Sequence, residues 1–549
     1  MPHSISRRRS LQIGITGATA AILNGRSILH AHSGTEPNHP TEPCAPAEGH
    51  SARLKISLND DVDGHGISGC IRIRKVGEKV WLNLSPLLLR TEGLSKAVRA
   101  LGWHVVPGAS EVPVPPGRLE LEAFAGITTN LVRSVVSVGD GAMSTVGISL
   151  RQLFNPSEGG HVAGNTHVHL RSMTREQVNR YLTEIPQADG LEVVFVSYLE
   201  RALADRTYIS NKYTPDDFRK LNGKNLSFGS GQEYRHNFGP GAEGYGHVML
   251  LEMAKRILPA SLGPGITLAG TDGTPLRPGI RLAKDGGATI IWCHNSFGSE
   301  DIPNWLGGHV DAQNIFDGGN HGSYEDTFYR YLNLGMRVPF STGTDWFIYD
   351  FSRVYVPMKP GQPRTPAAWL AGLRRGQSII TNGPWLEFSV NQAGPGDELN
   401  YERPEILNIK ARVISRNDFK QLEIIRNGQV FAGIDSRKKD GYYECEYSSS
   451  DHRHHASEWW AARVSGDDTL KNELGGKTFA HTSPVYVNFK NRPLFDRDTA
   501  RGVIEEMEKS TKHIRRFGKF ADKGEEERVL SIYREAIKTL QGRLDRIKG

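Results

Sequence analysis

The central part of the chain alternates short apolar runs with amphipathic stretches, and this alternation limits the possible folds more than any other feature. Strands are predicted at residues 165–170, 191–196, 288–293 and 338–341, and helices at residues 174–185, 324–334 and 366–375. Strands that alternate with helices are typical of a parallel sheet, either a barrel or an open sheet. We therefore predict an α/β domain over residues 158–384.

Both flanks of this domain are predicted to be β-rich. Residues 52–157 contain short runs, such as residues 53–58 and 69–74, in which apolar and polar residues alternate as they do in half-buried strands. Residues 385–491 contain Asn427-Gly428 between two strand-like runs, which is a strong hairpin signal. We expect a small β-sandwich on each side of the α/β domain.

The last segment, residues 492–549, is charged and has the pattern of helices. Its apolar residues recur every three or four positions, at Val529, Ile532, Ala536, Leu540, Leu544 and Ile547. Such a stripe forms one face of a helix. We expect it to pack on the body of the protein or on a partner protein.

Composition narrows the class of protein. Of the 549 residues, 38% are hydrophobic and 23% are charged, which is typical of a folded chain of several domains. No apolar run reaches the roughly 18 residues that a membrane helix needs. The four cysteines are too few and too dispersed for a disulfide framework. We expect no membrane span, and a core held by packing.

The N-terminus has the layout of an export signal. Arg7, Arg8 and Arg9 precede an apolar stretch of small residues at 13–23, and the order resembles a twin-arginine signal over residues 1–32, followed by a linker at 33–51. The alternative is an exposed basic N-terminus with a short apolar segment. We expect export to the periplasm or the exterior.

The net charge gives little reason to expect a nucleic-acid partner. The four arginines in the first 31 residues account for four of the six net positive charges, which leaves +2 on the remaining chain. A nucleic-acid-binding protein usually carries a clear basic excess. We therefore expect a small-molecule substrate and no nucleic acid.

The sharpest chemical signal is His167-Val-His169 at the end of a predicted strand. Residues two apart on a strand share a face, so both imidazoles can reach one metal ion. The bare motif is weak, since 20 histidines give about 0.7 such pairs by chance, and His30/His32 and His452/His454 are two others. Only the middle pair lies on a predicted strand.

Four further candidate ligands occupy similar places in the same domain. His294 and Asp345 each follow a buried run, Glu233 follows a short strand, and His247 enters an apolar run. In parallel α/β folds the carboxyl ends of the strands gather on one face, where active sites form. Each residue alone has an ordinary structural explanation, but together they predict a metal site.

These residues carry a resemblance to the PHP (polymerase and histidinol phosphatase) superfamily, whose metal ligands follow this order. More closely, residues 376–390 (GQSIITNGPWLEFSV), 395–398 (PGDE) and 479–487 (FAHTSPVYV) are similar to the CehA/McbA-type metallohydrolases. The resemblance implies a distorted seven-stranded (β/α) barrel of PHP type, with metals at its strand ends, flanked by the N- and C-terminal β-sandwiches.

The resemblance also implies two metal sites. His167, His169, Glu233 and Asp345 would hold one ion, and Glu233, His247 and His294 a second, so that Glu233 bridges them. Imidazole and carboxylate ligands suit zinc, manganese or iron. Two such metals can share a hydroxide that attacks an ester, amide, carbamate or phosphoester. Glu233 and Asp345 are therefore expected to be catalytic.

Three departures from the superfamily pattern concern a third metal. Tyr198-Leu199-Glu200 stands where a Thr-Asp-His is usual, Asp345-Trp346-Phe347 replaces Asp-x-His, and the histidine that usually follows the His-x-His strand is absent. These three histidines would form the third trio, and they are lost together. This pattern favours a two-metal enzyme.

Arg353 is a candidate clamp for an anionic substrate group, because arginine matches phosphate or carboxylate with two hydrogen bonds. A surface ion pair is an equally simple role for it. The function predicted from the sequence is an exported metal-dependent hydrolase. The alternative is a non-catalytic exported binding protein on a degenerate PHP barrel.

Overall fold

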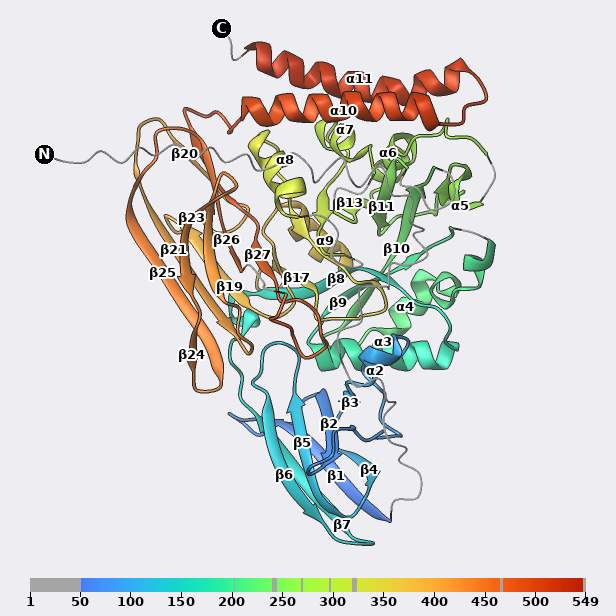
Figure 1. Cartoon of the computed structure of the whole chain (residues 1–549), viewed down its shortest axis with the longest axis vertical. Helices are drawn as coiled ribbons and strands as arrows, with labels where there is room; N and C mark the ends of the chain where they lie inside the picture. Colours follow the sequence, from blue (N-terminus) through green and yellow to red (C-terminus); the bar gives the residue numbers. More distant parts are fainter. Residues whose placement is uncertain are drawn as a thin grey trace, which may run out of the picture.

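The computed structural model describes residues 51–201, 203–238, 244–267, 270–295, 298–317, 323–464 and 468–546. The N-terminal β-sheets lie at one end of the molecule, the α/β region lies in the middle with the C-terminal strands along one side, and two long helices cross the opposite end (Figure 1). The expected export signal and most of the linker lie outside the described residues.

The N-terminal sheets pack face to face in a sandwich-like arrangement. One sheet has the order β4 (Ser110–Val114), β1 (Ala52–Asp60), β7 (Met143–Leu150), and the other β3 (His104–Val106), β2 (Gly69–Lys75), β5 (Gly117–Phe124), β6 (Val132–Val138). A short helix, α2 (Lys96–Arg99), precedes β3. Alternate residues of β1, from Ala52 to Leu58, are buried in a core that both sheets share. This is the period-two burial expected of half-buried strands.

The α/β region is built on one mixed sheet. Its strands are β8 (His161–His169), β9 (Val193–Tyr198), β10 (Ser227–His236), β11 (Gly246–Leu251), β12 (Ser261–Leu262), β13 (Thr289–Cys293), β14 (Ala312–Asn314), β15 (Phe340–Ser341), β16 (Asp345–Trp346), β17 (Arg353–Pro357) and β18 (Ile379–Thr381). Strands β8, β9 and β10 are parallel, as are β13, β14 and β15, whereas β11 runs antiparallel to both β10 and β13.

Helices connect and cover these strands. They are α3 (Arg175–Asp189), α4 (Pro215–Leu221), α5 (Pro264–Thr267), α6 (Arg277–Asp285), α7 (Asp301–Leu306), α8 (Arg330–Asn333) and α9 (Pro366–Arg374). The first of them, α3, begins with a capping box between Thr174 and Gln177 and ends at Gly190, whose φ of 72° suits a residue without Cβ. These signals fix the crossover that carries the chain from β8 to β9.

The α/β class predicted from the sequence is confirmed as a mixed sheet with helices, but the expected all-parallel order is wrong. Strand β17 runs antiparallel to β8, and β18 pairs with β27 of the C-terminal region, so the sheet continues beyond the central segment. A seven-stranded barrel of PHP type is not established by these pairings. The antiparallel pairs escaped prediction because buried strands of either direction have the same apolar pattern.

The C-terminal strands form a four-stranded sheet and an extension of the central sheet. The first contains β19 (Trp385–Val390), β21 (Ile406–Ser415), β25 (Tyr442–Arg453) and β24 (Arg437–Lys439), and the second β20 (Glu398–Tyr401), β22 (Gln421–Arg426), β23 (Gln429–Asp435), β26 (Glu458–Val464), β27 (Ala480–Thr482) and β28 (Val485–Phe489). The hairpin predicted at Asn427-Gly428 joins β22 to β23, and both turn residues have positive φ.

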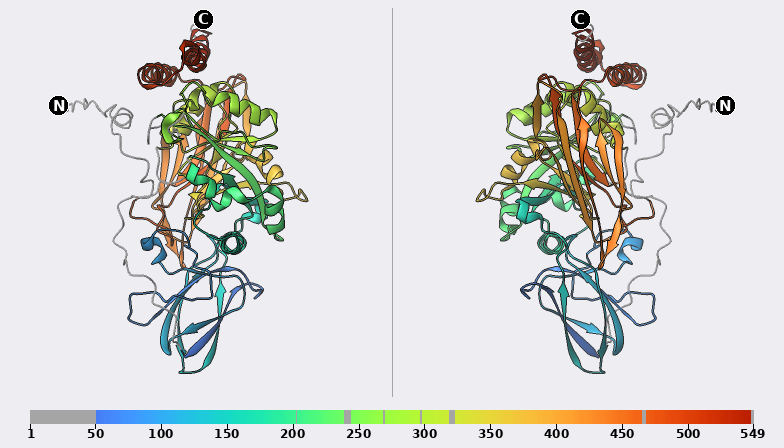
Figure 2. Two further views of the ribbon diagram at one scale, coloured as in Figure 1. Left: turned by 90° about the vertical axis from the view of Figure 1, so that its right-hand side faces the viewer. Right: turned by 90° about the vertical axis from the view of Figure 1, so that its left-hand side faces the viewer.

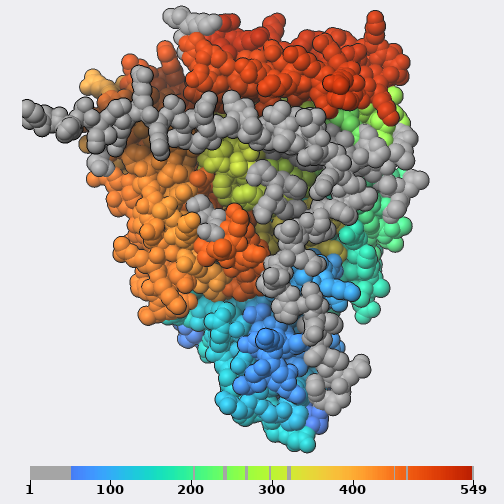
Figure 3. All heavy atoms as spheres, viewed as in Figure 1, coloured from blue at the N-terminus to red at the C-terminus, as the bar shows by residue number. Residues whose placement is uncertain are grey.

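The predicted helical tail consists of α10 (Arg497–Phe517) and α11 (Lys523–Arg546), which lie side by side and cap the end of the molecule opposite the N-terminal sheets (Figures 2 and 3). The predicted stripe is buried from Val529 to Leu544, while its last residue, Ile547, lies outside the described residues. Tyr533 Oη lies 2.7 Å from Ser299 Oγ. The tail therefore packs on the α/β region. None of the helices that the structure describes combines the length and apolar character needed to cross a membrane.

Candidate metal centre

Strand β8 brings His167 and His169 together inside the α/β region. Both side chains are fully buried, and their Nε2 atoms lie 2.9 Å apart. Val168 between them packs in a hydrophobic cluster on the other side of the strand. The expectation that alternation would direct both imidazoles to one point is therefore met by the geometry.

The second nitrogen of each ring faces an acceptor. His169 Nδ1 lies 2.9 Å from the carbonyl oxygen of Ser197, and His167 Nδ1 lies 2.7 Å from Asp317 Oδ2. A carbonyl oxygen only accepts hydrogen bonds, so His169 Nδ1 carries the proton and its Nε2 presents a lone pair. Two imidazoles are thus held with their Nε2 atoms aimed at the same small volume.

Two carboxylates complete this group. Glu233 Oε2 lies 3.1 Å from His169 Nε2 and 3.9 Å from His167 Nε2, while Asp345 Oδ1 lies 3.4 Å from His167 Nε2 and 3.8 Å from His169 Nε2. Four ligand atoms around a tetrahedral metal with bonds of about 2.0–2.2 Å lie about 3.3–3.6 Å apart. The observed separations bracket these values, so the group could hold a metal ion.

A second group shares Glu233 through its other oxygen. Glu233 Oε1 lies 3.2 Å from His247 Nδ1 and 3.9 Å from His294 Nε2. Glu233 is on β10, His247 is on the antiparallel neighbour β11, and His294 follows β13. The Oε2 atom faces the histidines of β8 and Oε1 faces this pair, so one carboxylate contacts both groups.

The charges around the cluster favour a cation. Burial opposes the ionised form of Glu233, but Arg235, whose Nη1 lies 3.1 Å from Oε1, and the nearby histidines hold the pKa of Glu233 well below its usual value. Burial, reinforced by the charges of Glu233 and Asp317, raises the pKa of Asp345 to about 7. A bound cation would relieve this repulsion among the carboxylates.

Asp317 belongs to the cluster and was missed by the sequence analysis. It lies three residues beyond β14, is fully buried, and accepts a hydrogen bond from Asn314 Nδ2 at 2.9 Å. A third possible ligand group consists of His167, Cys293, His294 and Asp317. The available signal was an aspartate shortly after residues 312–315, but β14 is too short to show a pattern.

Arg353, the predicted anion clamp, does not belong to any of the possible ligand groups. Its buried guanidinium donates to the carbonyl oxygens of Asp189 at 2.7 Å and Phe351 at 2.9 Å. It thereby caps the last turn of α3, and the next residue of its strand, Val354, pairs with Gly164 in the middle of β8. The chain bends between Asp345 and Arg353, so the two residues are close in the sequence but their side chains have different partners.

The positions that depart from the superfamily pattern hold no further ligand group among the described residues. Glu200 contacts Tyr198 Oη and pairs with Arg206 at 2.6 Å, while Phe347 packs against Tyr181. Glu200 therefore belongs to a local ion pair.

Comparisons with known proteins assign this chain to no family. The sequence matches no protein-family model, and no similar protein is found among curated proteins.

Proposed function

We propose that the chain is a metal-dependent hydrolase of the CehA/McbA type that holds two divalent cations. One observation carries the proposal: the two oxygens of buried Glu233 face two separate groups of histidines. Such a carboxylate can hold two cations at the short separation used in two-metal hydrolysis. The distorted seven-stranded barrel implied by the resemblance is part of the same proposal.

The imidazole and carboxylate donors of the cluster suit divalent transition-metal ions such as zinc, manganese or iron. His167, His169 and Asp345 would hold the first ion, His247 and His294 the second, and Glu233 both. Divalent metals of this kind, when bound, activate water and polarise the bond to be hydrolysed. Esters, amides, carbamates and phosphoesters are the proposed substrates.

The remaining groups of the cluster orient the ligands. The cluster is accessible to solvent on one side. Arg235 holds Glu233, Asp317 holds His167, and the Ser197 carbonyl holds His169. The side chain of Asp345 is 13% exposed and that of His294 10%, whereas those of the β8 histidines are fully enclosed. A substrate would therefore approach from the side of Asp345 and His294.

Elemental analysis and activity of matched variants test this proposal. The purified full chain should hold about two metals, and His167→Ala and Asp345→Ala should lose both bound metal and hydrolysis of carboxyester and phosphoester test substrates. His309→Ala is the control, because His309 lies in the same region outside every possible ligand group. Trace metal in the wild type, or unchanged hydrolysis in both variants, would refute the proposal.

A non-catalytic binding protein remains the second candidate, because a cavity of about 310 Å³ lies away from the cluster. Trp81 and Arg72 of the N-terminal region line it together with Lys471 and Glu473 of the C-terminal region. This candidate predicts ligand binding that Trp81→Ala abolishes, without any metal-dependent hydrolysis.

We further propose export to the periplasm or the exterior, on the sequence of residues 1–32. A protein whose location is unchanged by Arg7→Lys with Arg8→Lys would not use the twin-arginine route.

A further inference from the structure

We propose that Arg171 and Arg201, which flank Trp346 at the open side of the cluster, bind an anionic group of the substrate, a carboxylate or a phosphate. The inference rests on the proposed function, since it places the anion beside the proposed metal centre. The substrates of the proposed hydrolase would then carry a carboxylate or a phosphate.

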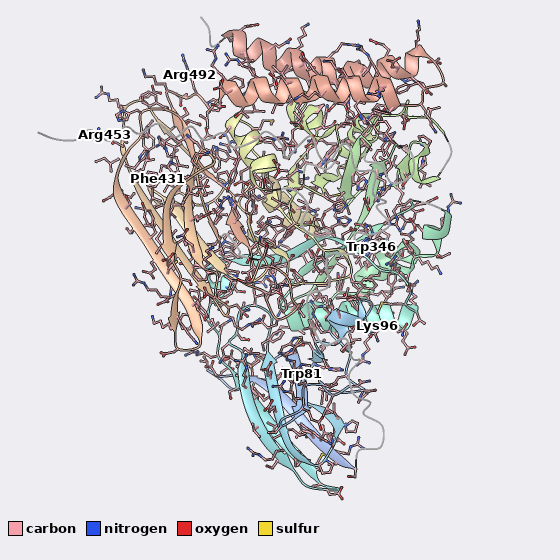
Figure 4. The ribbon with its side chains drawn as sticks, in the orientation of Figure 1. Trp81, Lys96, Trp346, Phe431, Arg453 and Arg492 are labelled. Carbon is pink, nitrogen blue, oxygen red and sulfur yellow. The ribbon has the colours of Figure 1, made fainter. Side chains whose placement is uncertain are left out.

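Trp346 connects the two arginines to the cluster. It follows Asp345 and pairs with His169 in the β16–β8 register, and its ring centroid lies 5.4 Å from that of His169. The guanidinium carbon of Arg171 lies 4.8 Å and that of Arg201 5.1 Å from the Trp346 ring. Trp346 lies within the α/β region, between the N-terminal sheets and the C-terminal helices (Figure 4). Both positive charges are therefore placed next to the metal ligands.

Arg171 continues the alternation that directs His167 and His169 to the cluster. It stands two residues beyond His169, at the position that would follow on the same face of the extended chain. Its side chain is partly exposed and hydrogen-bonds the side chain of Tyr208, and among the residues that the structure describes it has no carboxylate partner. Its charge is available to a ligand.

Arg201 is held in place by two neighbouring side chains, Asp205 and Tyr208. Its Nε lies 2.8 Å from Asp205 Oδ2, and its Nη2 donates to Tyr208 Oη at 2.5 Å. The ion pair fixes the guanidinium beside the indole ring. Asp205 and Tyr208 occupy Nε and Nη2 of Arg201, which leaves Nη1 for an oxygen of an anion.

Trp346 and the two arginines lie next to the solvent-accessible side of the cluster, where a substrate would bind. Asp345 is the most exposed of the proposed ligands, and Trp346 is its neighbour in the chain. A substrate whose reacting bond lies against the cluster would extend an adjacent group over Trp346. The two guanidinium groups make an anionic group there favourable, and a neutral group gains nothing from them.

Anion binding to the metal-loaded full chain tests the inference. Isothermal titration with inorganic phosphate and with acetate should give at least about tenfold weaker binding for Arg171→Gln than for the wild type, with unchanged metal content. The two titrants separate a phosphate preference from a carboxylate preference. Arg175→Gln is the matched control, because Arg175 stacks on Tyr213 instead of Trp346 and pairs with Asp217 at 2.7 Å. Equal affinities in wild type and Arg171→Gln, or no binding to the wild type, would overturn the inference.

A pair of esters separates this inference from the proposed function. Arg171→Gln should lower kcat/KM for mono-para-nitrophenyl succinate, which carries a carboxylate, by about ten- to a hundredfold, and leave para-nitrophenyl acetate within about twofold. Equal losses on both esters overturn the inference and leave the proposed function intact. If neither ester nor any phosphoester is hydrolysed while Arg171→Gln still weakens anion binding, the proposed function fails and the anion site stands.

Discussion

His167 Nδ1 lies 2.7 Å from Asp317 Oδ2, and both side chains are fully buried. Asn314 Nδ2 contacts the same carboxylate oxygen at 2.9 Å, so Asp317 is itself held in place. A carboxylate behind a metal-ligating imidazole fixes the ring and makes it a stronger ligand. The pair therefore gives Asp317 a positioning role in the proposed centre.

Asp317→Ala should weaken metal binding by about 10- to 100-fold, because His167 loses the partner that orients it. Competition with a chromogenic chelator measures this affinity. Asp326→Ala is the control, since Asp326 is exposed and lies in the segment that follows. An unchanged affinity in Asp317→Ala would show that His167 needs no support from Asp317.

Glu233→Ala and His247→Ala should differ in metal stoichiometry. The first change removes the proposed shared ligand and should leave less than about one metal per chain, whereas the second should leave about one. Elemental analysis after dialysis measures both. Ser230→Ala, on the same strand and facing the other side, should keep the full content. Equal stoichiometry in the Glu233 and His247 variants would argue against a shared carboxylate.

The sequence predicted the cluster better than it predicted its surroundings. His167, His169, Glu233, His247, His294 and Asp345 converge because each occupies or follows a strand of the same sheet, which alternation of apolar runs makes visible. Asp317 was missed because β14 has only three residues, and the direction of β11 was missed because a buried strand shows no sign of its orientation.

Side-chain direction was the other limit on prediction. Arg353 lies eight positions after Asp345, yet its guanidinium reaches Asp189 and Phe351 instead of the cluster. Nothing in a local motif states which neighbour a long side chain will reach, since tertiary packing decides it.

Arg353→Met should lower stability and leave the metal centre intact. The change removes two donors and leaves the carbonyl oxygens of Asp189 and Phe351 buried, which costs about 2–4 kcal/mol. Thermal unfolding should show the lower midpoint, while metal content stays at the wild-type value. Hydrolysis that falls with no loss of stability would instead restore the role of Arg353 as a substrate clamp.

Glu300 makes stability depend on pH through a group outside the metal cluster. Its side chain is fully buried, and Oε2 accepts hydrogen bonds from the backbone N–H groups of Leu276 at 2.9 Å and Arg277 at 3.2 Å. Burial, only partly offset by the charge of Arg277, raises the pKa of Glu300 from 4.5 to about 7. Between these values the folded chain holds a proton that the unfolded chain has lost. The stability contributed by this proton is complete below pH 4.5 and is lost as the pH rises through 7.

Glu300→Gln should therefore make the chain more stable than the wild type at pH 8, by about 1–3 kcal/mol, and nearly equal to it at pH 5. The amide stays neutral and its oxygen can still accept from the two backbone groups. Urea unfolding at both pH values measures the difference. Glu535→Gln is the control, because Glu535 pairs with Arg277 at 2.8 Å but its side chain is 72% exposed, so it should show no such dependence. A difference of the same size at both pH values would mean that Glu300 is ionised throughout, and that the hydrogen bonds from Leu276 and Arg277 outweigh its burial.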